Sequence, residues 1–361
     1  MVSQVVFSEI LDEDRSASGL SGAGYSLLRR RGVNLGWVKA GGVSDSDDEE
    51  GRRRWCHDEP VFLPQAVVID TSVEGFLSKT AGRVEAVLDG RPVEDVFAGV
   101  DRQGEFTAQA GFVDTGNDQE IVTVSFTSSD DPEGRDDLWM KAAWLSFDDE
   151  DPSLRFRFSF GMDGYDDPGR DLRRQRSALR LCRQWFPEVS VVTESPTLKR
   201  RLTRILNISS MVFVEPIVYF NGPNGGAQFH HDVERGHLGV VYAQVTGRTF
   251  WLALNKDALM RHIAAFAALP AGREVRPFCD RLDEVLDGVL PEALEVLLNR
   301  TPAFVGQLVA AGHGFVLGPG DLLLLPQADR QRCVWHSVFC LGGIMGEGLS
   351  LAMRSDAVEL L

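Results

Sequence analysis

Polar and apolar residues alternate without a break from Leu154 to Phe160, in the order Leu-Arg-Phe-Arg-Phe-Ser-Phe. Alternate side chains of a β-strand lie on the same face, so this pattern predicts a strand with one apolar face and one face carrying Arg155, Arg157 and Ser159. Other strand-like runs occupy residues 61–70, 104–113, 120–127 and 138–147. We expect these runs to form an antiparallel sheet in the first half of the chain.

A period close to 3.6 residues indicates the helices. Ser195 followed by Pro196 is typical of a helix start, and apolar residues continue on one face as far as Leu206. Residues 72–88 and the arginine-rich segment 170–185 are also predicted to be helical. Later in the chain, helical periodicity occurs in residues 257–268, 281–290, 291–298 and 302–311, the last after a capping Thr301.

The chain divides into three predicted regions. Residues 1–60 combine glycine, serine and runs of like charge with scattered apolar residues, as in GGVSDSDDEEGRRRW. This composition predicts a flexible acidic N-terminal arm, with a substrate lid or partner-binding segment as the alternative. We expect an α+β region at 61–205, which precedes or wraps a mainly β region at 206–361 that contains a helical insert at about 256–312.

Composition narrows the partners and the location. Of the 361 residues, 43% are hydrophobic and 25% charged, and the net charge is −16. Nucleic acid is an unexpected partner, because its phosphates require a basic surface. There is no apolar run of about 18 residues, and the N-terminus has acids where a signal peptide needs a basic start, so we expect a cytoplasmic protein without a membrane partner. The five cysteines include no Cys-x-x-Cys pair, which argues against a structural zinc site.

A His-x-Asp pattern, His230-His231-Asp232, follows a Gly/Pro/Asn turn. In a strand, residues 230 and 232 share a face and His231 lies on the other. His336 follows the predicted buried strand Leu322–Pro326 and a short loop, and it supplies a third candidate ligand. Two histidines and one carboxylate, with open coordination positions, make the facial triad of non-haem Fe(II) oxygenases. Zinc more often takes three or four N or S ligands, so iron is the predicted metal.

Residues 212–355 resemble the JmjC-type cupin hydroxylases. The resemblance rests on the Gly-rich turn, the His-x-Asp pattern, the segment Gln244–Arg248 with Trp251 after it, the Pro-Gly-Asp-Leu run at 319–322, and Trp335-His336. It implies an α+β, mainly β protein built on a double-stranded β-helix (cupin or jelly-roll) core. It also implies that His230, Asp232 and His336 bind Fe(II), and that 2-oxoglutarate and O₂ are co-substrates.

One position departs from the family pattern. Family members commonly carry a lysine that pairs with the distal carboxylate of 2-oxoglutarate, and this chain has Thr249 there. Arg354, 18 residues beyond His336, resembles the carboxylate-binding arginine of other 2-oxoglutarate oxygenases. A guanidinium binds a carboxylate bidentately, so Arg354 is the predicted anchor. The other predicted co-substrate contacts are Thr249, Gln244 and Tyr219, and the predicted substrate contacts are Asn221, His237 and Trp335.

These features together predict an Fe(II)- and 2-oxoglutarate-dependent oxygenase that hydroxylates an unactivated C–H bond and releases succinate and CO₂. A free or carrier-linked amino acid or another small metabolite is the expected substrate, because no peptide-reading module is recognisable. Three alternatives stay open: hydroxylation of a protein or peptide side chain, a metal cupin enzyme that does not use 2-oxoglutarate, and a non-catalytic ligand-binding cupin. A homodimer is compatible with the sequence.

Overall fold

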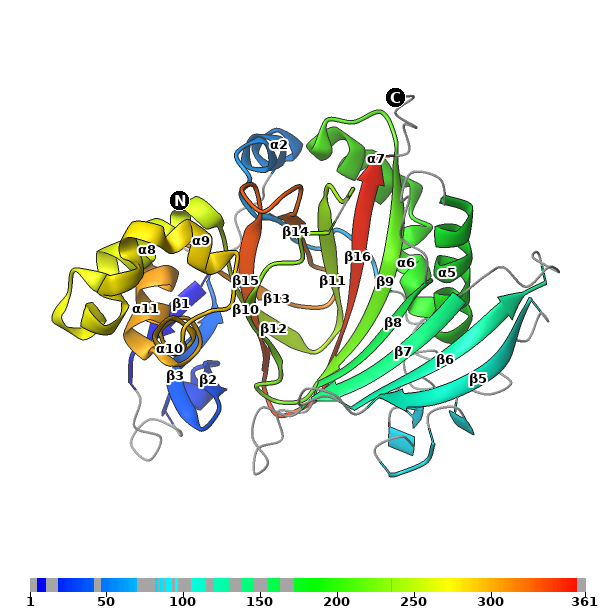
Figure 1. Cartoon of the computed structure of the whole chain (residues 1–361), viewed down its shortest axis with the longest axis horizontal. Helices are drawn as coiled ribbons and strands as arrows, with labels where there is room; N and C mark the ends of the chain where they lie inside the picture. The colour runs from blue at the N-terminus through cyan, green and yellow to red at the C-terminus, as the bar shows by residue number, and fades with distance from the viewer. Residues whose placement is uncertain are drawn as a thin grey trace.

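Two antiparallel sheets face each other across the centre of the protein (Figure 1). The larger sheet has nine strands in the order β4-β14-β11-β16-β9-β8-β7-β6-β5, and the smaller has four in the order β10-β15-β12-β13. Side chains from both sheets, including Tyr242, Trp251 and Val338, pack into one apolar cluster between them. The content is therefore mixed α and β, mainly β.

The computed structural model describes residues 5–10, 19–41, 47–69, 82–83, 85–86, 89–92, 95–96, 105–114, 120–129, 138–145, 155–162, 172–234 and 236–355. The nine-stranded sheet consists of β4 (Val61–Leu63), β5 (Phe106–Asp114), β6 (Glu120–Ser128), β7 (Leu138–Leu145), β8 (Arg155–Met162), β9 (Met211–Asn221), β11 (Gly239–Thr246), β14 (Leu322–Pro326) and β16 (Gly346–Ser355). The four-stranded sheet consists of β10 (Gly226–His230), β12 (Arg248–Asn255), β13 (Gly314–Leu317) and β15 (Val334–Leu341).

The antiparallel sheet predicted in the first half of the chain is confirmed. Strands β5 to β8 pair antiparallel in sequence order, and β8 pairs with β9 in the register Arg155↔Asn221 and Arg157↔Tyr219. The alternating segment of β8 buries Phe156, Phe158 and Phe160, as the period of two predicts. The sheet therefore runs without interruption from the first half of the chain into the second.

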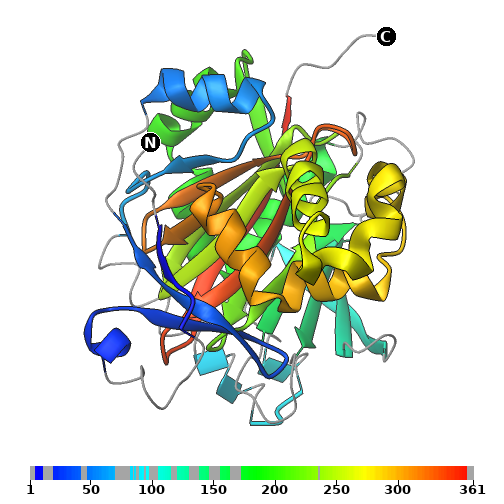
Figure 2. The same cartoon turned by 90° about the vertical axis from the view of Figure 1, so that its left-hand side faces the viewer.

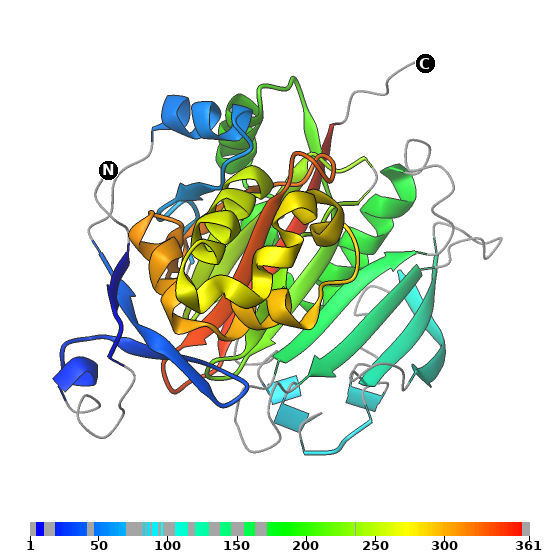
Figure 3. The same cartoon turned by 60° about the vertical axis from the view of Figure 1, so that its left-hand side comes forward.

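Helices cover the outer faces of both sheets (Figures 2 and 3). Helices α5 (Leu172–Trp185), α6 (Ser190–Thr193) and α7 (Pro196–Leu206), with the short 3-10 helix η1 (Pro187–Val189), pack on the nine-stranded sheet. The α7 start is as predicted, because Ser195 Oγ accepts a hydrogen bond from the Leu198 backbone N–H at 3.2 Å. The insert between β12 and β13 packs on the four-stranded sheet and contains α8 (Lys256–Ala267), η2 (Pro270–Arg281), α9 (Leu282–Leu286), α10 (Glu292–Arg300) and α11 (Pro302–Ala310).

The described residues of the segment 1–60 form regular structure in a region that the sequence predicts to be a flexible arm. Strands β1 (Val5–Ser8), β2 (Ser26–Arg30) and β3 (Val33–Ala40) make a three-stranded sheet, and α2 (Asp48–Cys56) follows. Arg30 is buried, donates from Nη2 to the Val338 carbonyl at 2.6 Å and lies over the Phe339 ring. These contacts join the N-terminal sheet to β15 over a long sequence separation, which local composition does not reveal. Residues 42–46 of the acidic run lie outside the described residues.

Several predicted boundaries differ from the structure. The strand predicted at 61–70 ends at Leu63, because Pro64 follows and has no N–H to donate to the sheet. The helix predicted at 281–290 is reduced to the five residues of α9 and follows a 3-10 segment. Thr301 precedes α11, but its hydroxyl donates to the Val296 carbonyl instead of capping that helix. The helix predicted at 72–88 falls largely on residues outside the described part of the chain.

Among the described residues, no helix is both long enough and apolar enough to cross a membrane.

Candidate active site

Strand pairing brings the three predicted metal ligands together. In the four-stranded sheet His230, the last residue of β10, lies directly opposite His336 of β15. Asp232 lies in the loop two residues further on, so it reaches the same point from outside a strand, unlike the continuous strand expected from the sequence. His231 points away from this group, and its ring packs against Trp335 at a centroid distance of 5.2 Å.

The ligand-type atoms of this group are close enough to share one ion. Asp232 Oδ1 lies 3.4 Å from His230 Nε2, and Asp232 Oδ2 lies 3.4 Å from His336 Nε2. The two imidazole centroids are 4.2 Å apart, and all three donor atoms lie within 4.8 Å of one another. Two imidazole nitrogens and one carboxylate, left open on one side, are the donor set typical of a non-haem Fe(II) site.

Neighbouring groups fix the orientation of both imidazoles. His230 Nδ1–H donates a hydrogen bond to the Gln228 carbonyl at 2.7 Å, so Nε2, on the side of Asp232, is the nitrogen available to a metal. The Trp251 ring stacks on His336 at 5.4 Å, with 24° between the planes. The Gln228 carbonyl thus sets the tautomer of His230, and Trp251 holds the ring plane of His336.

The three groups also set one another's charge. Burial opposes ionisation of Asp232, but His230 and His336 outweigh it and hold the pKa of that carboxyl well below its usual range. Burial, reinforced by His230, lowers the pKa of His336 to about 3. Burial opposes the charged form of His230, but Asp232 outweighs that effect and raises its pKa. The site therefore presents an ionised carboxylate and a neutral His336 at neutral pH, which are the forms that bind metals.

The triad opens into a cavity of about 420 Å³ between the two sheets. His230 and Asp232 expose 41% and 40% of their side chains, whereas His336 exposes only 4%. Tyr219, a predicted co-substrate contact, and Asn221, a predicted substrate contact, both line this cavity. The described lining is otherwise a mixture of aliphatic, aromatic, polar and charged side chains, which suits a small ligand that carries polar groups.

Gln244 and Thr249, predicted as co-substrate contacts, lie in a closed hydrogen-bond network and do not line the cavity. Gln244 Oε1 accepts from Thr249 Oγ1 at 2.6 Å and from the Tyr242 hydroxyl at 3.2 Å. Its Nε2 donates to the carbonyls of Thr246 and Glu347, and Trp251 Nε1 donates to Thr249 Oγ1. Both residues are fully buried, so their polar atoms are already satisfied within the protein.

Two more predicted site residues lie apart from the triad. Arg354 is buried near the end of β16, beside Gly236, and is not among the residues lining the cavity. His237 lies with Glu215 and Glu234 in a second group of metal-ligand type, with its Nε2 3.3 Å from Glu215 Oε2. Of this group only Glu234 lines the cavity.

Trp335, a predicted substrate contact, points away from the cavity. It is 3% exposed and belongs to the apolar core shared with the helical insert. Successive residues of a strand face opposite sides, so the strand that directs His336 inward directs Trp335 outward. The structure therefore places Trp335 in the apolar core and not in the cavity lining.

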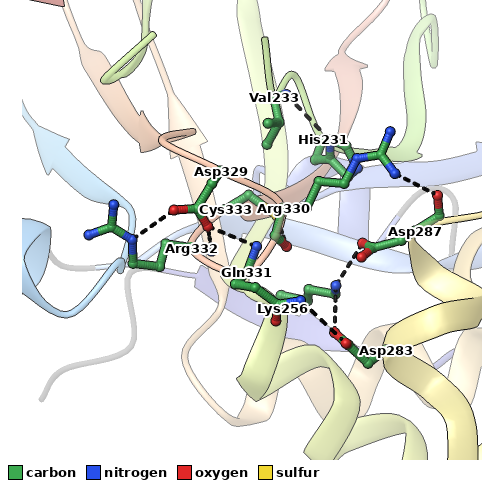
Figure 4. A network of polar contacts seen from close by, with 10 residues as sticks. All are labelled: His231, Val233, Lys256, Asp283, Asp287, Asp329, Arg330, Gln331, Arg332 and Cys333. Carbon is green, nitrogen blue, oxygen red and sulfur yellow. Dashed lines mark hydrogen bonds and ion pairs between the residues drawn. The ribbon is translucent and has the colours of Figure 1, made fainter. Parts of the chain in front are cut away.

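A polar network ties the loop before β15 to the helical insert (Figure 4). Lys256 Nζ, at the start of α8, forms ion pairs of 2.6 Å with both Asp283 and Asp287. In the loop, Asp329 Oδ1 accepts from the backbone N–H groups of Gln331 and Arg332. Gln331 Nε2 donates to Asp283 at 3.3 Å. The insert thereby supports the loop that leads into the strand carrying His336.

Sequence reasoning missed two cavity residues. Arg155 and Arg157 of β8 both line the cavity, and among the described lining residues they are the only lysines or arginines. The alternating pattern at 154–160 placed them on one polar face, but nothing local shows that this face meets a cavity. That outcome depends on β8 pairing with β9, which lies more than fifty residues later in the chain.

Comparison with known proteins yields no matching family model and no matching curated protein. Solved structures that align include an oxidoreductase of the 2OG-Fe(II) oxygenase family from Burkholderia pseudomallei, with 9% identity, 87% of this chain and 93% of that chain covered, and a TM-score of 0.34. A prolyl-4-hydroxylase from Pseudomonas putida aligns with 8% identity, 86% and 100% coverage, and a TM-score of 0.29. The non-heme alpha ketoglutarate dependent epimerase SnoN from nogalamycin biosynthesis aligns with 9% identity, 85% and 80% coverage, and a TM-score of 0.34. At these values we infer function from the site's own residues alone.

Proposed function

We propose that the protein is an Fe(II)- and 2-oxoglutarate-dependent oxygenase that hydroxylates an amino acid or another small metabolite. The observation that carries the proposal is the convergence of His230, Asp232 and His336 on one point of an open cavity. Three protein ligands leave coordination positions for a bidentate 2-oxo acid and for O₂. Iron and 2-oxoglutarate bound there would supply an oxidant for an unactivated C–H bond, with succinate and CO₂ as the co-products.

The residues around the triad suit this role. His230 and His336 present Nε2, and Asp232 supplies a carboxylate whose lowered pKa keeps it ionised. Trp251 and the Gln228 carbonyl hold the imidazoles in place, so little reorganisation is needed when an ion binds. His336 forms the buried side of the site, whereas His230 and Asp232 are partly exposed and line the cavity.

A double-stranded β-helix belongs to the same proposal. One sheet contains β9, β11, β14 and β16, and the other contains β10, β12, β13 and β15. This distribution of eight consecutive strands over two facing sheets supports a jelly-roll core, to which β4 and β5–β8 add strands at either edge. The JmjC-type resemblance, a cytoplasmic location, the absence of nucleic-acid and membrane partners, and a homodimer are parts of the proposal that rest on sequence alone.

A metal cupin that does not use 2-oxoglutarate is the second candidate. Thr249 favours it, because the position offers no cation and its hydroxyl is engaged by Gln244. The two candidates differ in whether the metal site accepts a 2-oxo acid.

Anaerobic addition of Fe(II) and then 2-oxoglutarate tests the proposal. We expect a visible metal-to-ligand charge-transfer band in the parent protein and its loss in Asp232→Ala. Incubation in air with candidate amino acids and peptides, followed by mass spectrometry, then identifies the substrate by a gain of one oxygen atom and an equal amount of succinate. A folded, iron-loaded protein that gives no band and no succinate would exclude 2-oxoglutarate and favour the second candidate.

A further inference from the structure

Strand β8 places two arginines inside the proposed metal cavity, although it lies outside the eight strands of the proposed jelly roll. Arg155 and Arg157 are two residues apart on one strand, so both side chains point to the same face. Their strand partners across the pair with β9 are Asn221 and Tyr219, which line the same cavity. The cationic wall of the cavity therefore comes from β8.

Contacts hold Arg155 across the gap between the two sheets. Its Nη1 donates to the carbonyl of Gly226 at 3.0 Å, and Gly226 belongs to β10, the strand that ends at His230. Gly226 has φ 144°, and a Cβ there would collide with the Val338 carbonyl, so only glycine allows this close strand approach. Arg155 is thereby hydrogen-bonded to the strand that carries the candidate metal ligand His230.

Arg157 retains unused hydrogen-bonding capacity. It forms a side-chain hydrogen bond with Tyr219, but its buried Nε has no acceptor among the described residues. Neither arginine forms an ion pair with a described carboxylate, although Asp232 lies close enough to Arg155 to interact with its charge. Burial lowers the pKa of Arg155, which reflects the cost of holding a cation there without a paired anion. An anionic ligand would relieve that cost for Arg155 and would give the unused Nε of Arg157 an acceptor.

Other positions that face the cavity offer no cation. The positions of β16 that lie alongside Tyr219 and Ile217 are Gly348 and Ser350, and a Cβ at Gly348 would collide with the Tyr242 hydroxyl. The predicted anchors do not compensate, because Thr249 is buried in its network and Arg354 lies off the cavity. Within the described lining, the two arginines of β8 are the groups suited to a carboxylate.

We propose that Arg155 and Arg157 bind the distal carboxylate of the 2-oxo dicarboxylate whose other end binds the metal. This inference rests on the proposed function and assigns the co-substrate anchor to a strand outside the jelly roll, in place of Arg354. A planar guanidinium provides paired N–H donors, and two of them on one face provide a site that selects a dicarboxylate over a monocarboxylate. Both residues act in binding and positioning the co-substrate.

The test compares 2-oxoglutarate with 2-oxobutyrate, which has the same metal-binding end and no second carboxylate. Each is titrated anaerobically into the Fe(II)-loaded protein by calorimetry and by the visible band, for the parent, Arg155→Gln, Arg157→Gln and the double variant. We expect Kd for 2-oxoglutarate to rise about 10- to 100-fold in the single variants, as befits loss of charged hydrogen bonds. Kd for 2-oxobutyrate and for Fe(II) alone should not change.

Two matched arginines serve as controls. Arg248→Gln removes an exposed cation from β12, and Arg354→Gln removes the anchor predicted from sequence. Both should retain the parent affinity for 2-oxoglutarate. Should a glutamine variant fold poorly, Arg155→Lys and Arg157→Lys keep the charge and lose the paired donors, and they should show an intermediate Kd.

The possible results separate this inference from the proposed function. Selective loss of 2-oxoglutarate affinity in the β8 variants supports the inference. Unchanged 2-oxoglutarate affinity in the double variant, or selective loss in Arg354→Gln, overturns it and leaves the proposed function intact. A parent protein that binds Fe(II) and neither 2-oxo acid overturns both.

Discussion

At the level of single residues, Gly348 of β16 leaves room for the hydroxyl of Tyr242. Gly348 pairs with Tyr219 on one side and Gln244 on the other, and the Tyr242 hydroxyl occupies the place of its missing side chain. That hydroxyl donates to Gln244 Oε1, within the network that also holds Thr249 and Trp251. One glycine thus allows the buried network beneath the triad to form.

Gly348→Ala should therefore destabilise the protein. The added methyl group forces Tyr242 out of its hydrogen bond, and overpacking of this kind typically lowers the free energy of unfolding by about 1–3 kcal/mol. Urea denaturation measures the change. Gly343→Ala is the matched control, because a Cβ at that position meets nothing within 4 Å and should leave stability unchanged. Equal stability of the two variants would show that the space beside Tyr242 is not limiting.

At the scale of elements, the start of α8 is fixed by a buried lysine. The Lys256 side chain is fully buried, while its partners Asp283 and Asp287 expose 48% and 21% of their side chains. Burial opposes the charged form, but the two carboxylates outweigh it and raise the pKa of Lys256. Exposure of the carboxylates to water weakens each ion pair, so we expect removal of the lysine to lower the free energy of unfolding only moderately.

Lys256→Met should lower the free energy of unfolding by about 1–3 kcal/mol. The substitution keeps a long apolar side chain in the buried position but removes the two charged hydrogen bonds of the ammonium group. Thermal and urea unfolding measure the effect. The control Arg273→Met removes an ion pair with Glu274 in which both side chains are more than 70% exposed, and it should have no measurable effect. A Lys256→Met protein as stable as the control would mean that the insert is held by its apolar core alone.

A buried carboxyl group on β16 makes the stability of the protein depend on pH. Glu347 of β16 is 3% exposed; burial, reinforced by the neighbouring buried Glu188, raises its pKa well above the usual value of 4.5. Above that pH the unfolded chain releases the proton while the folded protein keeps it, so stability falls as pH rises toward the folded pKa. Glu347→Gln removes this loss.

We therefore expect the stability of Glu347→Gln relative to the parent to increase as pH rises from about 4.5 toward neutrality, as measured by unfolding at several pH values. Glu50→Gln is the control, because its carboxylate is on the surface, paired with Arg53, and has a lowered pKa. If the free energy of unfolding differed between Glu347→Gln and the parent by the same amount at all pH values, Glu347 would not hold a proton in the folded protein.

For the molecule as a whole, the sequence predicts single helices and strands better than it predicts which of them pack or pair with one another. The strand at 322–326 and the helix start at Ser195 follow from local pattern, because buried strands and capped helices have local signals. His230 and Asp232 come two residues apart, and His336 is identified by its place after a buried strand. These three side chains come together because β10 pairs with β15. The family resemblance implied that they share one metal ion, whereas the periodicity of the sequence did not.

What the sequence missed depends on contacts between distant segments. Arg155 and Arg157 line the cavity because β8 is added to the edge of β9, and the N-terminal sheet contacts β15 through Arg30. Trp335 lies outside the cavity lining because a residue next to a ligand in a strand faces the opposite side. Arg354 was chosen by its distance from His336 along the chain, which does not fix whether a side chain reaches the cavity.

Anaerobic titration of Fe(II) into the purified, metal-free protein by calorimetry tests whether the triad binds the metal. We expect one equivalent to bind the parent, and affinity to fall about a hundredfold or more in His230→Gln, Asp232→Asn and His336→Gln, because each removes a first ligand. Glu215→Gln and His237→Gln, from the second group of metal-ligand type, should bind like the parent. One equivalent retained in Asp232→Asn and lost in Glu215→Gln would contradict the assignment of the metal to the triad.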